Sequence, residues 1–172
     1  MSRAFVKEND LEHAGIDIPE RPISPEINYV TPFGLDQINE KLSMLDKDRG
    51  QFLGKEDAIS IQKKMRIEKD IRYYAARLKS AILVKPDSQT SDKVLFGACI
   101  ELQNEDGNFE FYEIVGEDEA DFKKNKISYV SPIAKSVIGN KLGEEVLLKK
   151  PEGLARLIIK KISFKHIIYL IT

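Results

Sequence analysis

Four basic residues in one short stretch form the first group whose chemistry points to a partner. They are Lys63, Lys64, Arg66 and Lys69. Their positive charges would be favoured beside the phosphates of RNA. An ordinary solvated helix face has the same composition, so both interpretations stay open. The positive charge is local, because residues 35–85 hold twelve basic and eight acidic groups while the whole chain has a formal net charge of −1.

The common catalytic and metal-binding patterns are absent from the sequence. Its two histidines, His13 and His166, are isolated, and its single cysteine, Cys99, offers no Cys-x-x-Cys pair for a metal. There is no glycine-rich phosphate loop and no Gly-x-Ser-x-Gly turn that would present a nucleophile. These absences favour a protein that acts by contact and insertion rather than by its own catalysis.

The composition is that of a globular protein without a membrane segment. Hydrophobic residues make up 42% of the 172 residues and charged residues 32%, a balance that supports a folded core. The longest apolar run, Ile167–Ile171, is far shorter than the ~20 residues of a membrane-spanning helix. Since there is neither a signal-peptide pattern nor a disulfide pair, we expect a cytoplasmic protein.

Residues 1–29 are predicted to form an extended N-terminal arm. The segment has an excess of acidic groups and contains Pro19, Pro22 and Pro25. A residue that precedes proline is pushed out of the α-helical region, which favours extended backbone. The arm is interpreted either as a flexible tail or as a strap laid along the rest of the protein.

Residues 30–85 are predicted to form an antiparallel helical hairpin, a short coiled coil. Thr31 is a good N-cap for the first helix, of about 20 residues or roughly 30 Å, and Pro32 suits its first position. Gly54 is suited to follow the end of this helix, and Asp57 to cap the second. The apolar seams, at helical spacing, are Leu35, Ile38, Leu42, Leu45 and Phe52, then Ile67, Ile71, Tyr74, Leu78 and Ala81.

Residues 86–92 are interpreted as a polar linker, and residues 93–172 as a second domain built from strands. The predicted strands are Val94–Leu102, Phe109–Val115, Ile127–Val130, Glu145–Lys149 and Arg156–Phe164, with Ile167–Ile171 as a last strand or packed tail. A turn at residues 104–108 joins the first two. Ser131 and Pro132 begin one short helix, which Gly139 ends. The predicted fold class is α+β, a helical hairpin plus an antiparallel sheet with one short helix.

The acidic stretch Glu117–Asp121 lies between two of these predicted strands. Its composition is that of a solvated loop, although it could also meet a basic surface on a partner.

Several ordered blocks resemble the GreA/GreB family of bacterial transcription elongation factors. The blocks are residues 94–98 (VLFGA), 112–121 (YEIVGEDEAD), 127–134 (ISYVSPIA), 139–146 (GNKLGEEV) and 151–153 (PEG). Thr31-Pro32-x-Gly34, at the start of a helical hairpin, is also similar to that family. The resemblance covers residues 30–164, and the preceding residues look like the N-terminal extension of a subgroup.

The resemblance implies an FKBP-like fold for the C-terminal domain and bacterial RNA polymerase as the partner. In that family this domain docks at the rim of the polymerase's secondary channel, and the coiled coil enters the channel. Transcript RNA and DNA would be met only indirectly, and we expect a monomer. The docking residues that the resemblance implies are Asp121, Ser131, Pro132, Ile133 and Ala134.

The hairpin tip departs from the family. There, tip acids help to hold a Mg²⁺ shared with the polymerase active site, because such a metal prefers hard oxygen ligands, and the polymerase itself cuts the transcript. The family's Gly-Asp-x-x-Glu-Asn-type loop is missing here. The hairpin is also shorter by about two turns per arm, which would retract the tip by about 10 Å. The tip acids here, Glu56 and Asp57, either keep the metal-holding role or are a solvated loop residue and a helix cap.

Four functions follow as alternatives, the last of them a free-standing adaptor whose hairpin binds another helix. A Gre-type factor could stimulate cleavage of backtracked transcripts through its tip acids. It could instead only occupy the channel and compete with other Gre factors, as the short-coiled Rnk-type relatives look built to do. In both cases the chain modulates the polymerase and is not itself an enzyme. The third alternative, an FKBP-like prolyl isomerase, needs a concave aromatic pocket, whereas core packing is the expected role of Phe96, Phe109, Phe111 and Phe164.

Overall fold

The computed structural model describes residues 19–86, 91–151 and 153–164. The predicted strand or tail at Ile167–Ile171, most of the arm and most of the linker lie outside these ranges. The chain divides into two units. We call Asn39–Lys79, with the described residues up to Pro25, the hairpin unit. We call Glu26–Ile38, with the described residues from Ser80 onward, the sheet unit.

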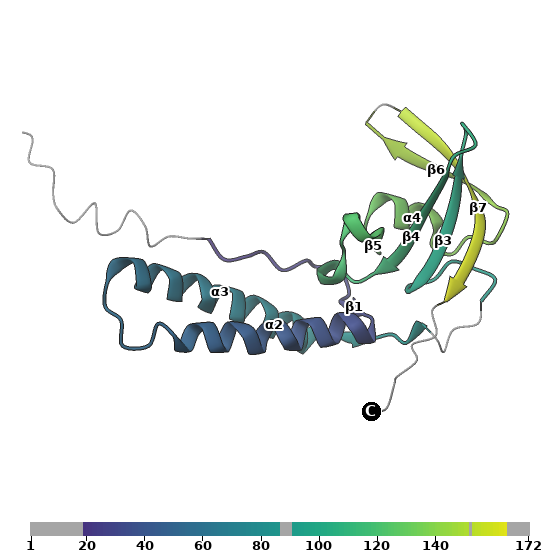
Figure 1. Cartoon of the computed structure of the whole chain (residues 1–172). Helices are drawn as coiled ribbons and strands as arrows, with labels where there is room; N and C mark the ends of the chain where they lie inside the picture. Colours follow the sequence, from purple (N-terminus) through teal and green to yellow (C-terminus); the bar gives the residue numbers. More distant parts are fainter. Residues whose placement is uncertain (1–18, 87–90, 152, 165–172) are drawn as a thin grey trace, which may run out of the picture. The chain divides into compact units, whose positions relative to one another are not determined.

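Two antiparallel helices, α2 (Pro32–Gly50) and α3 (Ala58–Ser80), form the predicted hairpin (Figure 1). At 1.5 Å per residue, the 19 residues of α2 span about 28 Å, close to the predicted length. The seam residue Leu45 is buried, whereas Phe52 lies beyond the helix because α2 already ends at Gly50. Gly54 was predicted to follow directly after this helix. It lies four residues beyond the last helical residue, Gly50, and has a positive φ of 73°.

Both predicted helix caps are confirmed. The Thr31 Oγ1 atom accepts a hydrogen bond from the backbone N–H of Gly34 at 2.9 Å. The Asp57 Oδ1 atom accepts one from the backbone N–H of Ser60, also at 2.9 Å. Each side chain therefore satisfies one of the N–H groups that the first turn of a helix leaves without a backbone partner.

Two short parallel strands, β1 (Tyr29–Val30) and β2 (Ile82–Leu83), belong to the sheet unit. The sequence predicted Tyr29 as part of the arm and the other three residues as part of the hairpin, so the structure differs from the prediction here. The backbone N–H of Ile82 donates to the carbonyl oxygen of Asn28 at 2.8 Å. Tyr29 is aromatic and Val30 and Ile82 are β-branched, residue types that favour such a ladder over a continued helix.

A five-stranded sheet with the order β5-β4-β3-β7-β6 forms the centre of the sheet unit. The strands are β3 (Ala98–Asn104), β4 (Phe109–Val115), β5 (Lys126–Ser128), β6 (Glu145–Lys150) and β7 (Gly153–Phe164). Most neighbours are antiparallel, but β5 is parallel to β4, so the prediction of a purely antiparallel sheet is wrong. Parallel pairing requires a crossover, and here it contains two 3₁₀ turns, η2 (Glu117–Glu119) and η3 (Phe122–Lys124).

Strand β3 begins at Ala98, four residues later than predicted. A tight turn precedes it, in which the Ala98 N–H donates to the Leu95 carbonyl oxygen at 3.1 Å. Gly97 takes a φ of 83° in this turn, and a Cβ atom there would lie 2.5 Å from Cγ of Pro86. Only glycine fits both the positive φ and the close approach.

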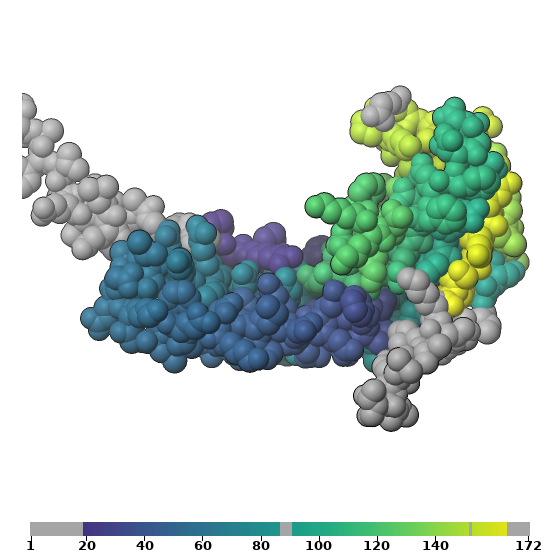
Figure 2. Space-filling model, in the orientation of Figure 1, coloured from purple at the N-terminus to yellow at the C-terminus, as the bar shows by residue number. Residues whose placement is uncertain are grey.

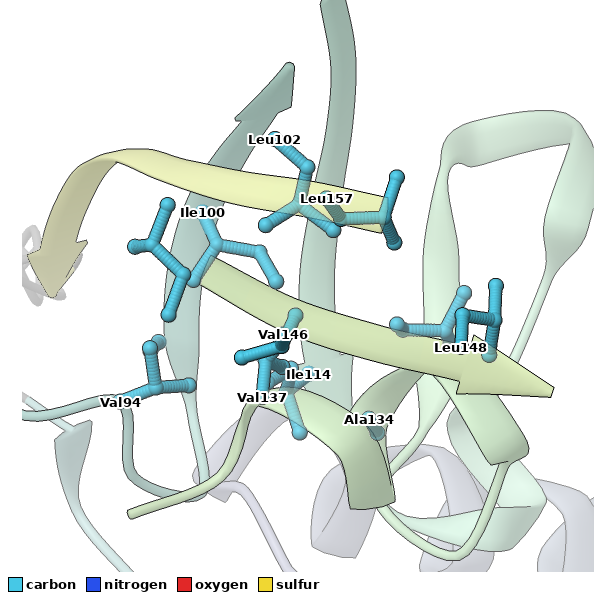
Figure 3. Packing of buried hydrophobic residues seen from close by; sticks show 12 residues of the cluster. Val94, Ile100, Leu102, Ile114, Ala134, Val137, Val146, Leu148 and Leu157 are labelled. Atoms are coloured by element: carbon cyan, nitrogen blue, oxygen red, sulfur yellow. The ribbon is translucent and has the colours of Figure 1, made fainter. Parts of the chain in front are cut away.

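The core of the sheet unit lies between one face of the sheet and the helix α4 (Pro132–Val137) (Figure 3). Ile100 and Leu102 of β3 and Ile114 of β4 are at most 3% exposed, and Ala134 and Val137 of α4 are fully buried. These burials follow the alternation that strands impose on their side chains. The predicted class, a helical hairpin followed by a C-terminal sheet domain, is confirmed.

Two phenylalanines that were assigned to the core lie outside it. Phe109 and Phe111 on β4 are 50% and 56% exposed. They pair with Gln103 and Glu101 of β3, whose side chains are also outside the core. Core packing therefore explains neither ring.

Candidate functional site

The short helix α4 carries most of the residues that the family resemblance implies for docking. Ser131 caps it, because its Oγ atom accepts a hydrogen bond from the backbone N–H of Ala134 at 3.2 Å, and Pro132 occupies the first position. Pro132 is exposed, while Ser131 and Ile133 are partly buried. Ala134 is 0% exposed and packs in the core, so it is wrong as a contact residue.

Asp121 shapes the loop that precedes β5. Its Oδ1 atom accepts a hydrogen bond from the backbone N–H of Lys123 at 3.1 Å, and its Oδ2 atom lies 3.4 Å from Nζ of Lys124. Its backbone exchanges two hydrogen bonds with Lys126, each of 3.0 Å. The side chain is 38% exposed, so it is accessible to a partner while it holds the loop in place.

Glu119 contradicts the prediction of a solvated acidic loop at Glu117–Asp121. Its side chain is 3% exposed. The Oε2 atom accepts a hydrogen bond from the hydroxyl of Thr31 at 2.5 Å, and the Oε1 atom pairs with Nζ of Lys126 at 2.8 Å. Sequence reasoning missed this residue, because a glutamate between two other acids gives no signal of burial and Thr31 is 88 positions away.

The first turn of α2 packs closely around this carboxylate. A Cβ atom at Gly34 would lie 2.7 Å from Oε2 of Glu119, too close for any larger residue without displacement. The Lys126 ammonium also lies 4.4 Å from the centre of the exposed Phe33 ring. Glu119 and Lys126 therefore tie the start of α2 to the start of β5, within the sheet unit.

The predicted tip acids have unequal surroundings. Asp57 is occupied as the cap of α3, and its hydrogen bonds with Ser60 lower the pKa of its carboxyl from the ordinary 3.8. Glu56 is exposed. Across residues 19–86, 91–151 and 153–164, no three or more His, Cys, Asp or Glu side chains gather where they could hold a metal ion. A Mg²⁺ would accordingly find at most two carboxylates at the tip, one of them already serving as a cap.

The structure brings together two of the four predicted basic residues. Lys63 and Arg66 line one groove together with Phe52. The Nζ atom of Lys63 lies 6.0 Å from the centre of the Phe52 ring. The groove is also lined by Asp48, Gln51 and Ile67. Lys64 instead forms a 3.9 Å pair with Glu68 one turn along the same helix, and Lys69 is partly buried.

The described end of the N-terminal arm lies on α3, as the contacts and the space-filling view show (Figure 2). Arg21 covers the ring of Tyr73, and Glu20 pairs with Arg72 at 2.6 Å. Further along, the hydroxyl of Tyr129 in the sheet unit donates to the backbone carbonyl of Ile27. For these residues, the contacts agree with the interpretation of the arm as a strap laid along the protein and not with its interpretation as a flexible tail.

None of the helices within the described ranges is long and apolar enough to span a membrane.

Comparison with known proteins identifies relatives over most of the chain. Residues 89–164 match the family model "Transcription elongation factor, GreA/GreB, C-term". Transcription elongation factor GreB of Neisseria meningitidis serogroup B is 32% identical over 153 residues, which cover 80% of this chain and 94% of that protein. GreA of Syntrophotalea carbinolica is 43% identical over 89 residues, 51% of this chain and 56% of that protein.

Among solved structures, the GreA factor homolog 1 (Gfh1) of Thermus thermophilus matches 80% of this chain and 99% of its own, with 21% identity and a TM-score of 0.37. A further sequence relative, GreB of Haemophilus ducreyi, is 35% identical over 152 residues, 80% of this chain and 94% of its own length. The sequence relatives, together with a helical hairpin followed by a sheet domain, show that the chain belongs to the GreA/GreB family of transcription elongation factors.

Proposed function

We propose that this chain binds bacterial RNA polymerase at its secondary channel through the sheet unit and regulates elongation by occupying the channel. The observation that supports this proposal is the position of the two predicted tip acids. Asp57 caps the helix α3, so of these two only Glu56 has a carboxylate that does not cap a helix. The family membership supports the general role, and the geometry of α4 supports the docking surface.

The proposed docking surface consists of Asp121, Ser131, Pro132 and Ile133. Ser131 holds the first turn of α4 rigid through its cap, so that Pro132 is presented at low entropic cost. Phe122, next to Asp121, is 73% exposed and adds apolar area to the same loop. Ala134 is left out of the surface because it is fully buried.

The mode of action depends on the tip acids. A Mg²⁺ in a nucleotide site is held by one or two carboxylates together with phosphates. The Asp57 Oδ1 atom is already a hydrogen-bond acceptor at 2.9 Å, so using this carboxylate for a metal would weaken the cap of α3. This favours occupation of the channel over metal delivery.

Stimulation of transcript cleavage is the second candidate, and the exposed carboxylate of Glu56 favours it. In that case Glu56 would be one of the groups holding a Mg²⁺ shared with the polymerase, which would supply activation of the attacking water.

Binding is tested with purified polymerase and the full-length chain. We expect Pro132→Ala and Ile133→Ala to weaken binding about tenfold or more, as truncations at an interface centre do. Leu154→Ala, which alters an exposed apolar residue of β7, is the control and should bind normally. Failure of the unaltered chain to bind polymerase would overturn the proposal.

The mode is tested with backtracked elongation complexes, with and without a cleavage-stimulating Gre factor. We expect the chain alone to leave the transcript uncut and to suppress cleavage by the added factor. Glu56→Gln and Asp57→Asn should leave this suppression intact, because asparagine still caps a helix. Cleavage stimulated by the chain and lost in both variants would instead establish the second candidate.

A further inference from the structure

The strand β6 lies at one edge of the five-stranded sheet, with β7 as its neighbour. Within the described ranges, β7 alone forms backbone hydrogen bonds with residues 145–150. The N–H and C=O groups of β6 that point away from β7 can therefore accept a further strand. Val146 and Leu148 point into the core of the sheet unit (Figure 3), so one face of β6 is already covered.

The charges along this edge are ordered symmetrically about Leu147. Two glutamates, Glu144 and Glu145, precede it, and two lysines, Lys149 and Lys150, follow it at the same spacings. All four charged residues are exposed, and Leu147 is 55% exposed. Among the described residues, neither lysine has an ion-pair partner. Charges that only protect an edge from pairing have no need of this order, with acids at one end, bases at the other and an apolar residue between them.

An antiparallel copy of the same strand would place opposite charges against each other. When a twofold axis passes through Leu147, residues equally far from it on opposite sides face each other. Glu145 then lies opposite Lys149 of the copy, and Glu144 lies opposite Lys150 of the copy. The two Leu147 side chains meet at the axis. Opposite charges at such cross-strand positions stabilise a pair of strands, and like charges destabilise it.

The contacts that the two glutamates already make leave them able to pair with lysines of a copy. Glu145 lies 3.6 Å from Nη1 of Arg156, and both side chains are more than half exposed, so this ion pair contributes little. The Oε2 atom of Glu144 accepts a hydrogen bond from the backbone N–H of Lys141 at 2.9 Å. A carboxylate has a second oxygen atom that can accept from another donor.

We propose that β6 binds a second copy of this chain by antiparallel pairing about Leu147, which joins two five-stranded sheets across a twofold axis. The proposal goes beyond the proposed function and does not depend on it. It also differs from the monomer expected from the sequence. Because a single strand from each copy gives a small interface, the dimer should be weak and should form as the concentration rises.

Sedimentation equilibrium of the full chain tests this proposal, at concentrations up to about 1 mM because a small interface is weak. We expect the average mass to rise from that of one chain towards that of two. Two variants give the edge a single sign of charge, the acidic-edge variant Lys149→Glu/Lys150→Glu and the basic-edge variant Glu144→Lys/Glu145→Lys. Each should stay monomeric, because like charges would face each other, whereas an equimolar mixture of the two should form a mixed dimer.

The matched control places the same change of charge on an interior strand of the sheet. Lys160→Glu/Lys161→Glu alters two exposed lysines of β7 and should self-associate like the unaltered chain. This control has the net charge of the acidic-edge variant, yet it should pair more weakly with the basic-edge variant, because Lys149 and Lys150 would face lysines. Equally strong pairing would mean attraction between net charges alone and would overturn the proposal. Circular dichroism confirms that each variant is folded.

A cysteine at position 147 tests the register. Pairing about Leu147 puts the two Cα atoms at this position about 4.5–5.5 Å apart, a separation that a disulfide can span. In a Cys99→Ser background with oxidised glutathione, Leu147→Cys should give a disulfide-linked dimer. Leu154→Cys, at an exposed position of β7, should stay monomeric. Equal crosslinking at both positions, an unaltered chain that is monomeric at every concentration, or undiminished self-association of the two edge variants would each refute the proposal.

Discussion

The guanidinium carbon of Arg21 lies 3.7 Å from the centre of the Tyr73 ring, and the Nη1 atom of Arg21 donates to the hydroxyl of Tyr74 at 3.3 Å. The neighbouring Glu20 pairs with Arg72 of the same helix. Tyr73 is only 8% exposed. The described end of the arm is thus a structural part of the hairpin unit.

Replacing Arg21 by alanine should lower the free energy of unfolding by about 0.5–1 kcal/mol, the typical worth of an exposed cation–π contact. Lysine keeps the positive charge but cannot stack its planar group on the ring. The free energy of unfolding of Arg21→Lys should therefore lie between those of the unaltered and Arg21→Ala chains. Urea unfolding followed by circular dichroism measures both variants. Arg66→Ala removes an exposed arginine of α3 and is the control. An Arg21→Ala chain as stable as the control would show that the strap adds nothing.

The cap at Asp57 predicts a dependence of stability on pH. Its hydrogen bonds with Ser60 lower the pKa of the carboxyl from 3.8 in the folded chain. The stabilisation is therefore fully present above the unfolded-state pKa and is lost as the pH falls through the lower, folded-state pKa. The asparagine side chain of the Asp57→Asn variant would cap the helix without titrating.

The stability difference between the unaltered and Asp57→Asn chains should accordingly shrink as the pH drops below 3.8. Urea midpoints collected through this range measure the effect. A difference that stays constant with pH would contradict the role of the charged carboxylate in the cap.

The phenol of Tyr112 predicts a dependence of stability on pH at high pH, in addition to that of Asp57 at low pH. Burial, followed by its hydrogen bond to Glu110 at 2.9 Å, raises the pKa of the Tyr112 phenol from 10.0 to about 12. Because the folded chain favours the neutral phenol, this contribution to stability is present below pH 10 and is lost as the pH rises towards about 12.

Ultraviolet absorbance of tyrosinate follows this ionisation directly. We expect a component near pH 12 that is absent in Tyr112→Phe. Glu110→Gln removes the acceptor charge but keeps the burial, so it should move the component only part of the way back. Identical titration curves for the unaltered and Tyr112→Phe chains would refute the assignment.

Local signals in the sequence were sufficient for much of the fold. Thr31, Asp57 and Ser131 cap the helices they were expected to cap, because a cap depends only on residues two or three positions away. The bounds of β4 were predicted without error, since Phe109–Val115 follows the clear turn signal at residues 104–108.

Features that depend on distant residues were not predictable in the same way. Glu119 is buried because Thr31 and Lys126 pair with it, and these partners lie 88 and seven positions away in the sequence, beyond the reach of a local pattern. The parallel pairing of β5 depends on the path of the crossover rather than on its hydrophobic pattern. Ala134 shares one short helix with the exposed Pro132, and which face of α4 turns inward is decided by the sheet beneath it.

Substitutions of Ala134 and Pro132 should therefore have different effects on the free energy of unfolding. Ala134→Leu adds volume to a filled core and should cost about 1–3 kcal/mol of stability. Pro132→Ala alters an exposed residue and should leave the free energy of unfolding within about 0.5 kcal/mol of the unaltered chain. Urea unfolding of the two variants separates them. A Pro132→Ala chain as destabilised as Ala134→Leu would mean that Pro132 is structural and that its binding defect has another cause.

The pair of Lys126 and Glu119 predicts an asymmetry between two truncations. Removing one partner of a buried pair costs about 3–5 kcal/mol, because the other charge is left uncompensated. Glu119 is 3% exposed and Lys126 is 17% exposed, and the long lysine side chain can move its charge towards water. Lys126→Ala should therefore destabilise the chain more than Glu119→Ala. The double variant should cost less than the sum of the two, since it leaves no stranded charge. Additive losses in this double-mutant cycle would show that the two groups, although 2.8 Å apart, are not energetically coupled.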